Sequence, residues 1–99
     1  MMFFDNALHA LRNGEAVARR GWNGKGMFLY LVPSASYAPQ TAIAKAVWGG
    51  KPVPYGAYIA MKTAQGNVVP WTASQTDLLA GDWVTVPPGE LSKEGQTNG

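Results

Sequence analysis

The chain begins with apolar residues at helical spacing. Phe4, Leu8 and Leu11 recur every three or four positions, which predicts a short amphipathic helix over residues 4–13. Gly14 follows directly, and glycine is typical of a helix end because it tolerates the left-handed backbone that stops a helix. We therefore expect one short helix before the first strand.

Beyond this helix, short runs of β-branched and aromatic residues alternate with turns that contain glycine and proline, a pattern typical of an antiparallel sheet. Residues 65–67 predict a hairpin between two of these runs. Ser74 is expected to cap a short second helix that runs through Leu79 and is stopped by Gly81. We predict an α+β fold: a small single domain with a mostly antiparallel sheet, an N-terminal helix and a short second helix. The runs expected to form strands are residues 15–19, 27–32, 57–63, 68–71 and 82–86.

Two segments do not follow either pattern. The glycines and prolines of residues 34–56 favour an ordered insertion loop, whereas residues 42–48 favour a helical turn, and the sequence leaves both open. Residues 87–99 are polar and predict a disordered tail. This leaves residues 1–86 as the folded, ligand-binding α+β domain.

The composition favours a compact core with aromatic residues to spare. Hydrophobic residues make up 46% of the 99 positions and charged residues 14%. Four tryptophans, four tyrosines and three phenylalanines exceed what one small core needs, and a domain of this length buries a limited share of its surface. We therefore expect association into a homo-oligomer and exposed aromatic residues. Trp48, Tyr55 and Tyr58 are candidates for a pocket rim or equally for a subunit contact.

The charge and the missing residue types exclude several classes of protein. A formal net charge of +2 suits a small phosphate-bearing ligand but is too scattered for a surface that tracks a nucleic acid duplex. The adjacent pair Arg19-Arg20 favours a solvated edge. The chain has no cysteine and only His9 as histidine, so we expect no disulfide and no metal site. The N-terminal residues do not resemble a secretory signal and no apolar run reaches the roughly 20 residues of a membrane span, which predicts a soluble intracellular protein.

The residues needed for catalysis are also missing. His9 lies in the middle of the predicted helix, where it is expected at the surface. Asp77 and Asp82 are five residues apart and separated by Gly81, which does not suit a site of paired carboxylates. Residues 21–26 lack the spacing and the final Lys-Ser/Thr of a phosphate-binding loop. We predict that the protein is not an enzyme and needs no cofactor.

A glycine-rich turn carries the first set of candidate binding residues. Its glycines let backbone N–H groups approach an anion, Lys25 adds positive charge, and Trp22 offers a flat face for a base or a ribose. In the alternative interpretation the turn is a hairpin whose Trp22 folds back onto the core. The turn reads Gly21-Trp22-Asn23-Gly24-Lys25-Gly26-Met27.

A second set follows in residues 69–77. Trp71 stands just before the helix that Ser74 caps, and the N–H groups at the start of this helix predict an anion site. Ser74, Gln75 and Asp77 are candidates for hydrogen bonds to a ribose or a base edge. The alternative is an ordinary helix cap beside a core tryptophan. Two segments that each present tryptophan and amide groups favour a nucleotide-like ligand.

Three segments of the chain carry a family resemblance: Val17 to Met27 (VARRGWNGKGM), Tyr58 to Thr63 (YIAMKT) and Trp71 to Trp83 (WTASQTDLLAGDW). They resemble the Thoeris anti-defense 2 family of phage and prophage proteins, in the order of that family and over about residues 3–86. The resemblance implies a sponge, a homotetramer that binds cyclic ADP-ribose isomers made by bacterial Thoeris TIR proteins. The resemblance also implies that the signal is held intact, so that its effector is not triggered, and that the protein acts in the cytoplasm of the infected bacterial cell.

The resemblance also implies where the ligand binds. In that family the pocket lies between subunits, aromatic and amide residues surround the ligand, and Leu8 and Leu11 correspond to an apolar wall. Some members resemble binders of cyclic di- or trinucleotides at further sites, and members vary in the insertion at residues 34–56. A nucleic-acid-binding regulator and a small structural or interaction module without a ligand stay open as alternatives. The residues carried over are Trp22, Asn23, Gly24, Trp71, Ser74, Gln75 and Asp77, and Lys25 and Met27 of the same turn complete the candidate set.

Overall fold

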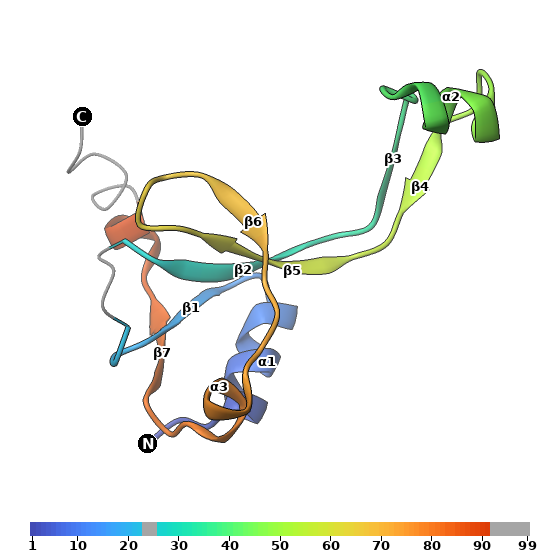
Figure 1. Ribbon diagram of the computed structural model, residues 1–99. Helices are drawn as coiled ribbons and strands as arrows, with labels where there is room; N and C mark the ends of the chain where they lie inside the picture. Colours follow the sequence, from blue (N-terminus) through green and yellow to red (C-terminus); the bar gives the residue numbers. More distant parts are fainter. Residues whose placement is uncertain (23–25, 92–99) are drawn as a thin grey trace.

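The computed structural model describes residues 1–22 and 26–91 (Figure 1). Its helices and strands confirm the α+β fold class. Within the described ranges, no helix is long and apolar enough to cross a membrane. The helices are α1 (Phe4–Arg12), α2 (Ala42–Trp48) and α3 (Gln75–Leu79), with a further helical turn at residues 88–91. The strands are β1 (Ala16–Arg19), β2 (Phe28–Val32), β3 (Ala35–Tyr37), β4 (Val53–Tyr55), β5 (Tyr58–Lys62), β6 (Val68–Pro70) and β7 (Trp83–Val86).

Five strands form one antiparallel sheet in the order β6-β5-β2-β1-β7. The middle strand is β2, whose run of apolar residues suits a position between two neighbours. The predicted hairpin is present as β5 and β6, and Gly66 in its turn has a φ of +98°, which favours glycine. Each strand of this sheet agrees with its predicted bounds to within one residue at either end.

Helix α1 packs across one face of the sheet. Its inward side chains Ala7 and Leu11 are fully buried against Val17 and Leu29, which lie opposite each other in β1 and β2. Burial of one such aliphatic side chain stabilises a fold by roughly 1.5–3 kcal/mol, so these contacts hold the helix on the sheet. The helix ends as predicted, because Gly14 adopts a φ of +84°.

Helix α3 has the predicted bounds, with Ser74 as its N-cap and Leu79 as its last residue. The predicted stop at Gly81 is wrong, because Ala80 is the C-cap and already has an extended backbone, with φ −70° and ψ 147°. The chain therefore leaves the helix one residue before Gly81 and continues directly into the segment before β7.

Residues 33–57 form an arm that projects from the sheet (Figure 1). Strands β3 and β4 continue the ribbon of β2 and β5, since Val32 pairs with Tyr58 and Ala35 pairs with Tyr55. Helix α2 lies at the tip of the arm. The sequence left open an ordered insertion loop and a helical turn, and both are present. Helix α2 is the predicted turn, and the paired strands β3 and β4 on either side of it order the rest of the insertion.

Candidate ligand-binding site

The two tryptophans predicted to stack on a ligand, Trp22 and Trp71, both pack against Trp83. Their ring centroids lie 5.6 and 6.0 Å from that of Trp83, with interplanar angles of 79° and 87°. Phe4 of α1 completes the cluster at 5.9 Å from Trp71 and 5.3 Å from Trp83. Trp83 is 1% exposed, whereas Trp22 and Trp71 are half-buried. Each of these two indoles therefore contributes one side to the core and keeps some surface exposed.

Ser74, Gln75 and Asp77 lie at the start of α3, shortly after Trp71. Ser74 and Asp77 form a capping box, in which the Asp77 N–H donates to the Ser74 Oγ at 3.0 Å and the Ser74 N–H donates to the Asp77 Oδ2 at 3.1 Å. The protein's own Asp77 carboxylate thus accepts the N–H of Ser74, next to the N–H groups that the sequence offers to an anion. Gln75 is exposed, as a ligand contact requires.

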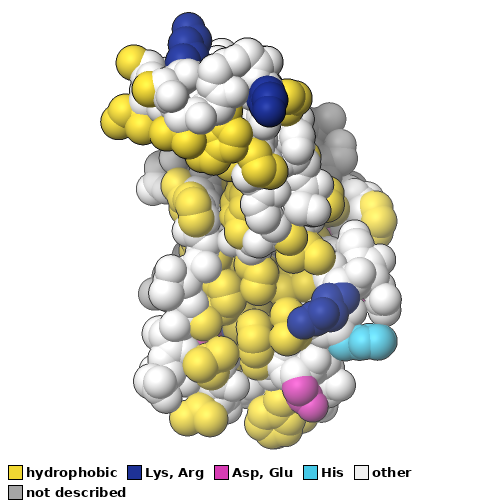
Figure 2. All heavy atoms as spheres, turned by 90° about the vertical axis from the view of Figure 1, so that its right-hand side faces the viewer, with side chains coloured by type: hydrophobic (Ala, Val, Ile, Leu, Met, Phe, Trp, Pro, Cys, Tyr) yellow, Lys and Arg dark blue, Asp and Glu magenta, His cyan; other side chains and the backbone are white. Residues whose placement is uncertain are grey.

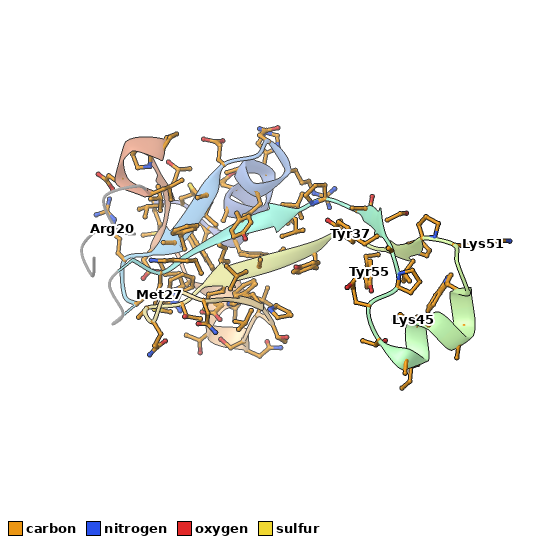
Figure 3. The ribbon with its side chains drawn as sticks, turned by 90° about the horizontal axis from the view of Figure 1, so that it is seen from above. Arg20, Met27, Tyr37, Lys45, Lys51 and Tyr55 are labelled. Carbon is orange, nitrogen blue, oxygen red and sulfur yellow. The ribbon has the colours of Figure 1, made fainter. Side chains whose placement is uncertain are left out.

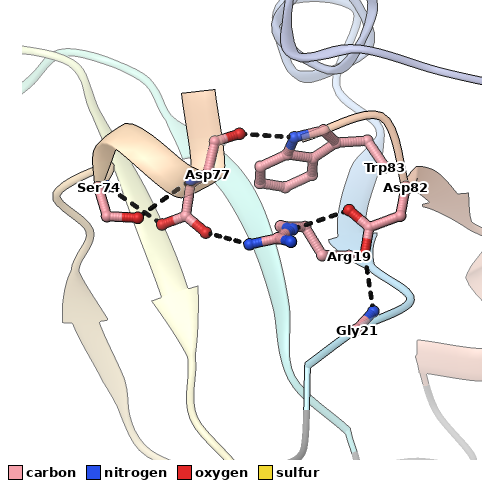
Figure 4. Close-up of polar contacts among 6 residues, drawn as sticks. All are labelled: Arg19, Gly21, Ser74, Asp77, Asp82 and Trp83. Carbon is pink, nitrogen blue, oxygen red and sulfur yellow. Dashed lines mark hydrogen bonds and ion pairs between the residues drawn. The ribbon is translucent and has the colours of Figure 1, made fainter. Parts of the chain in front are cut away.

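A charged residue outside the predicted site, Arg19, lies between the Trp22 segment and the start of α3. Arg19, the last residue of β1, forms ion pairs with Asp77 and Asp82, each at 2.8 Å (Figure 4). Its side chain is 17% exposed, so the expected solvated edge is wrong for Arg19, although Arg20 is exposed. The signal is present in the strand alternation, because Arg19 and the buried Val17 are two residues apart and point to the same face.

The charges of this network persist at neutral pH. Burial raises the pKa of Asp77, but hydrogen bonds from Arg19 and Ser74 outweigh it and leave the pKa lowered. The pKa of Asp82 is lowered chiefly by the hydrogen bond from Arg19 and further by the Gly21 N–H. The pKa of Arg19 is raised, first by its hydrogen bond to Asp82 and then by that to Asp77. Both carboxylates and the guanidinium are therefore ionised when they meet.

Leu8 and Leu11, the predicted apolar wall, line a cavity of about 300 Å³ between α1 and the end of the sheet nearest the arm. This volume is at the lower end of the range for small-molecule sites. Leu11 is fully buried and Leu8 half-buried, so Leu8 offers the larger surface. Figure 2 shows a band of apolar side chains on this face of the molecule. The other lining residues are Arg12, Leu31, Ala57, Tyr58 and Ile59.

Met27 lies at the other end of β2 from this cavity. It directly precedes Phe28, where β2 begins, whereas the cavity includes Leu31 near the end of the strand. Figure 3 shows Met27 and Arg20 at the end of the molecule opposite the arm. The length of β2 therefore separates Met27 from the Leu8 cavity within one chain. The remaining predicted residues of the turn, Asn23, Gly24 and Lys25, lie outside the described residues.

Exposed aromatic residues gather at the base of the arm. Tyr37 and Tyr55 belong to β3 and β4, with ring centroids 5.8 Å apart. Together with Tyr58 they line a cavity of about 270 Å³. Tyr55 and Tyr58 are 48% and 45% exposed, and Trp48 at the end of α2 is 37% exposed. Such exposure suits both of their expected roles, a pocket rim and a subunit contact.

The fold and this arrangement define a small α+β domain with three tryptophans gathered on one face of its sheet. Residues 2–86 match the sequence profile of the Thoeris anti-defense 2-like domain. The protein named Thoeris anti-defense 2 of Bacillus phage SP01 is 43% identical over 82 residues, which are 83% of this chain and 91% of the phage protein. The chain belongs to the Thoeris anti-defense 2-like family, as its three segments predict, and this membership supports an anti-defense role.

Proposed function

We propose that the protein is an anti-defense sponge. It binds a cyclic ADP-ribose isomer made by a bacterial Thoeris TIR protein and withholds it from the effector without degrading it. The observation that carries this proposal is the family match over residues 2–86, which includes both tryptophan segments. The protein then acts in the cytoplasm of the infected bacterial cell, where the signal is made. Cyclic di- or trinucleotides, which also present bases and negatively charged phosphates, are a further proposed class of ligand.

The arrangement of Trp22 and Trp71 supports a nucleotide-derived ligand. Stacking of one base on an aromatic side chain contributes about 1–3 kcal/mol. Trp83 holds both rings at fixed angles, so binding requires little further ordering of these side chains. A dissociation constant near 10 nM corresponds to about 11 kcal/mol, of which two stacked rings supply up to about half. Charge-assisted contacts to the pyrophosphate are the natural source of the remainder.

We expect binding without turnover. The protein is incubated for hours with cyclic ADP-ribose and with glycocyclic isomers prepared from a TIR enzyme, free ligand is removed, and the protein is heat-denatured. Mass spectrometry should then recover a bound isomer with its mass and retention time unchanged. Linear ADP-ribose in the released fraction would contradict the sponge. Retention of duplex DNA that weakens steeply with salt would instead favour a nucleic-acid-binding regulator.

We further propose a homotetramer with the ligand pocket between its subunits. A single chain leaves the arm uncovered, with Ile43 and Val47 of α2 78% and 66% exposed. The radius of gyration is 16.0 Å, whereas a compact domain of this length has about 13 Å. Association would cover these side chains. It would also allow Met27 of one subunit to approach the Leu8 cavity of another, which β2 prevents within one chain.

Light scattering at micromolar concentration should give about four times the chain mass of 10.6 kDa. The substitution Ile43→Asp should lower this mass, because a carboxylate buried at an apolar contact lacks a partner and costs several kcal/mol. Lys51→Asp places the same carboxylate on an exposed polar position of the arm and should leave the mass unchanged. A wild-type protein that is monomeric under these conditions would rule out the shared pocket.

A further inference from the structure

Arg19 joins the two segments that carry the predicted tryptophans. Its Nη1 lies 2.8 Å from the Asp77 Oδ1 on α3, and its Nε lies 2.8 Å from the Asp82 Oδ1. The second oxygen of Asp82 accepts the N–H of Gly21 at 2.9 Å, immediately before Trp22. The guanidinium of Arg19 thus joins Asp77, 58 positions away in α3, to Asp82, 63 positions away (Figure 4). Asp82 in turn holds the residue that precedes Trp22.

The carboxylate of Asp77 is already engaged at both oxygens. Oδ1 accepts from Arg19, and Oδ2 accepts the N–H of Ser74. The backbone of Asp77 takes part as well, because its carbonyl accepts the indole N–H of Trp83 at 3.0 Å. The Asp77 side chain is 14% exposed. It therefore has little surface to offer a ribose hydroxyl and is placed to hold other protein groups.

The network also fits closely around the tryptophan cluster. Arg19 and Trp83 are register partners in the neighbouring strands β1 and β7, so the guanidinium lies beside the indole on which the other tryptophans pack. The turn approaches Asp82 so closely that a Cβ at position 21 would lie 3.0 Å from its Oδ2. Glycine at position 21 is what permits this approach.

We propose that Arg19 is a positioning residue of the ligand site, which fixes Gly21 and Trp22 relative to the start of α3 through Asp82 and Asp77. Asp77 then acts through Arg19 and not by touching the ligand. Hydrogen bonds between charged partners are about twice as strong as neutral ones, and a site held rigid before binding loses less conformational entropy. The inference rests on the proposed function for the identity of the site, whereas the positioning itself is measurable without any ligand.

The ligand-free test follows the indole N–H signals in the NMR spectrum of the folded protein. Arg19→Met should shift the signals of Trp22 and Trp83 and speed hydrogen exchange at the Trp83 indole by at least about tenfold. Without its ion pair to Arg19, Asp77 is held less firmly, and its backbone carbonyl is the acceptor of the Trp83 indole N–H. Arg20→Met removes the same charge from the adjacent exposed side chain and should leave both signals in place. Equal spectra for the two variants would overturn the proposal.

A milder variant covers the case in which Arg19→Met does not fold. Arg19→Lys keeps the charge but lacks the planar fork that reaches two carboxylates at once. It should keep one ion pair and shift the same indole signals by a smaller amount. Unshifted signals in a folded Arg19→Lys protein, together with unchanged hydrogen exchange, would also count against the positioning role.

The role of Asp77 is tested by a double-mutant cycle on affinity, with cyclic ADP-ribose and its glycocyclic isomers as probes. Arg19→Lys and Asp77→Asn should each weaken binding by on the order of tenfold, and the double variant should be no weaker than the weaker single variant. Losses that multiply would show that Asp77 touches the ligand independently. Affinities that do not change in either single variant would overturn the role of Arg19 in the site.

The two tests separate the inference from the proposed function. If the wild-type protein binds none of the cyclic ADP-ribose isomers, the sponge proposal fails, and the indole signals still decide whether Arg19 positions the tryptophan segments. If the wild type binds and the indole signals of Arg19→Met match those of Arg20→Met, the sponge proposal stands and the positioning role fails.

Discussion

Truncation of Trp83 to alanine should lower the free energy of unfolding by about 3–5 kcal/mol. The indole is 1% exposed and packs against Phe4, Trp22 and Trp71, so its removal leaves a cavity where three rings meet. It also leaves the carbonyl of Asp77 without the indole N–H that now donates to it. Because the free energy of unfolding of small domains is only about 5–15 kcal/mol, this single substitution should remove a large part of it.

Urea denaturation followed by circular dichroism measures this loss, and Leu79→Ala is the matched control. Leu79 is the last residue of α3 and is 76% exposed, so its truncation should change the stability by no more than about 0.5 kcal/mol. Trp83→Phe should fall between the two, since it keeps a ring and loses the indole N–H. A Trp83→Ala protein as stable as Leu79→Ala would show that the cluster does not form the core of the domain.

The fold was predictable because its elements are encoded locally. The spacing of Leu8 and Leu11 indicates a helix, and Gly66 marks the hairpin where the backbone needs a positive φ. Gly81 shows the limit of such signals. Its sequence context resembles a helix stop, yet Ala80 already leaves the helix in an extended conformation, because the chain must turn directly toward Trp83 in β7.

The candidate site was predictable only in part, because its geometry depends on contacts between distant residues. The sequence singles out Trp22 and Trp71 but cannot show that both pack on Trp83. The alternation with Val17 indicates that Arg19 faces the core side of the sheet, but its partners 58 and 63 positions away are not visible in the sequence. The hydrogen bonds of Asp77 to Arg19 and Ser74 are likewise not visible in the sequence. Ligand binding itself stays a prediction.

The arm illustrates a second limit. Residues 42–48 have helical composition, and the flanking glycines and prolines indicate an ordered loop, so local signals point in both directions. The structure of this segment is decided by the register of a long two-stranded ribbon. Val32 pairs with Tyr58, and the pairing resumes at Ala35 and Tyr55. These paired residues are 26 and 20 positions apart in the sequence, so their register has no local signature.

The second large effect concerns Trp22 and Trp71. If both rings stack on the ligand, Trp22→Ala and Trp71→Ala should each weaken binding of a cyclic ADP-ribose isomer by about 1–3 kcal/mol, or roughly 5- to 150-fold. Both indoles also pack on Trp83, so each truncation should lower the melting temperature as well. Calorimetric titration and thermal denaturation are therefore measured on the same samples.

The effect of a substitution on affinity can be separated from its effect on stability. A loss of stability weakens the measured affinity only when a sizeable fraction of the protein is unfolded. A variant that retains about 4 kcal/mol of stability is about 99.9% folded, so its loss of stability alone weakens apparent binding by only about 0.1%. An affinity loss of fivefold or more in such a variant must then come from the missing ring at the ligand. Trp83→Phe is the control, since Trp83 is buried and its substitution should act on stability, with a smaller effect on affinity. A folded Trp22→Ala or Trp71→Ala protein that keeps full affinity would exclude that ring from the site, whatever its melting temperature.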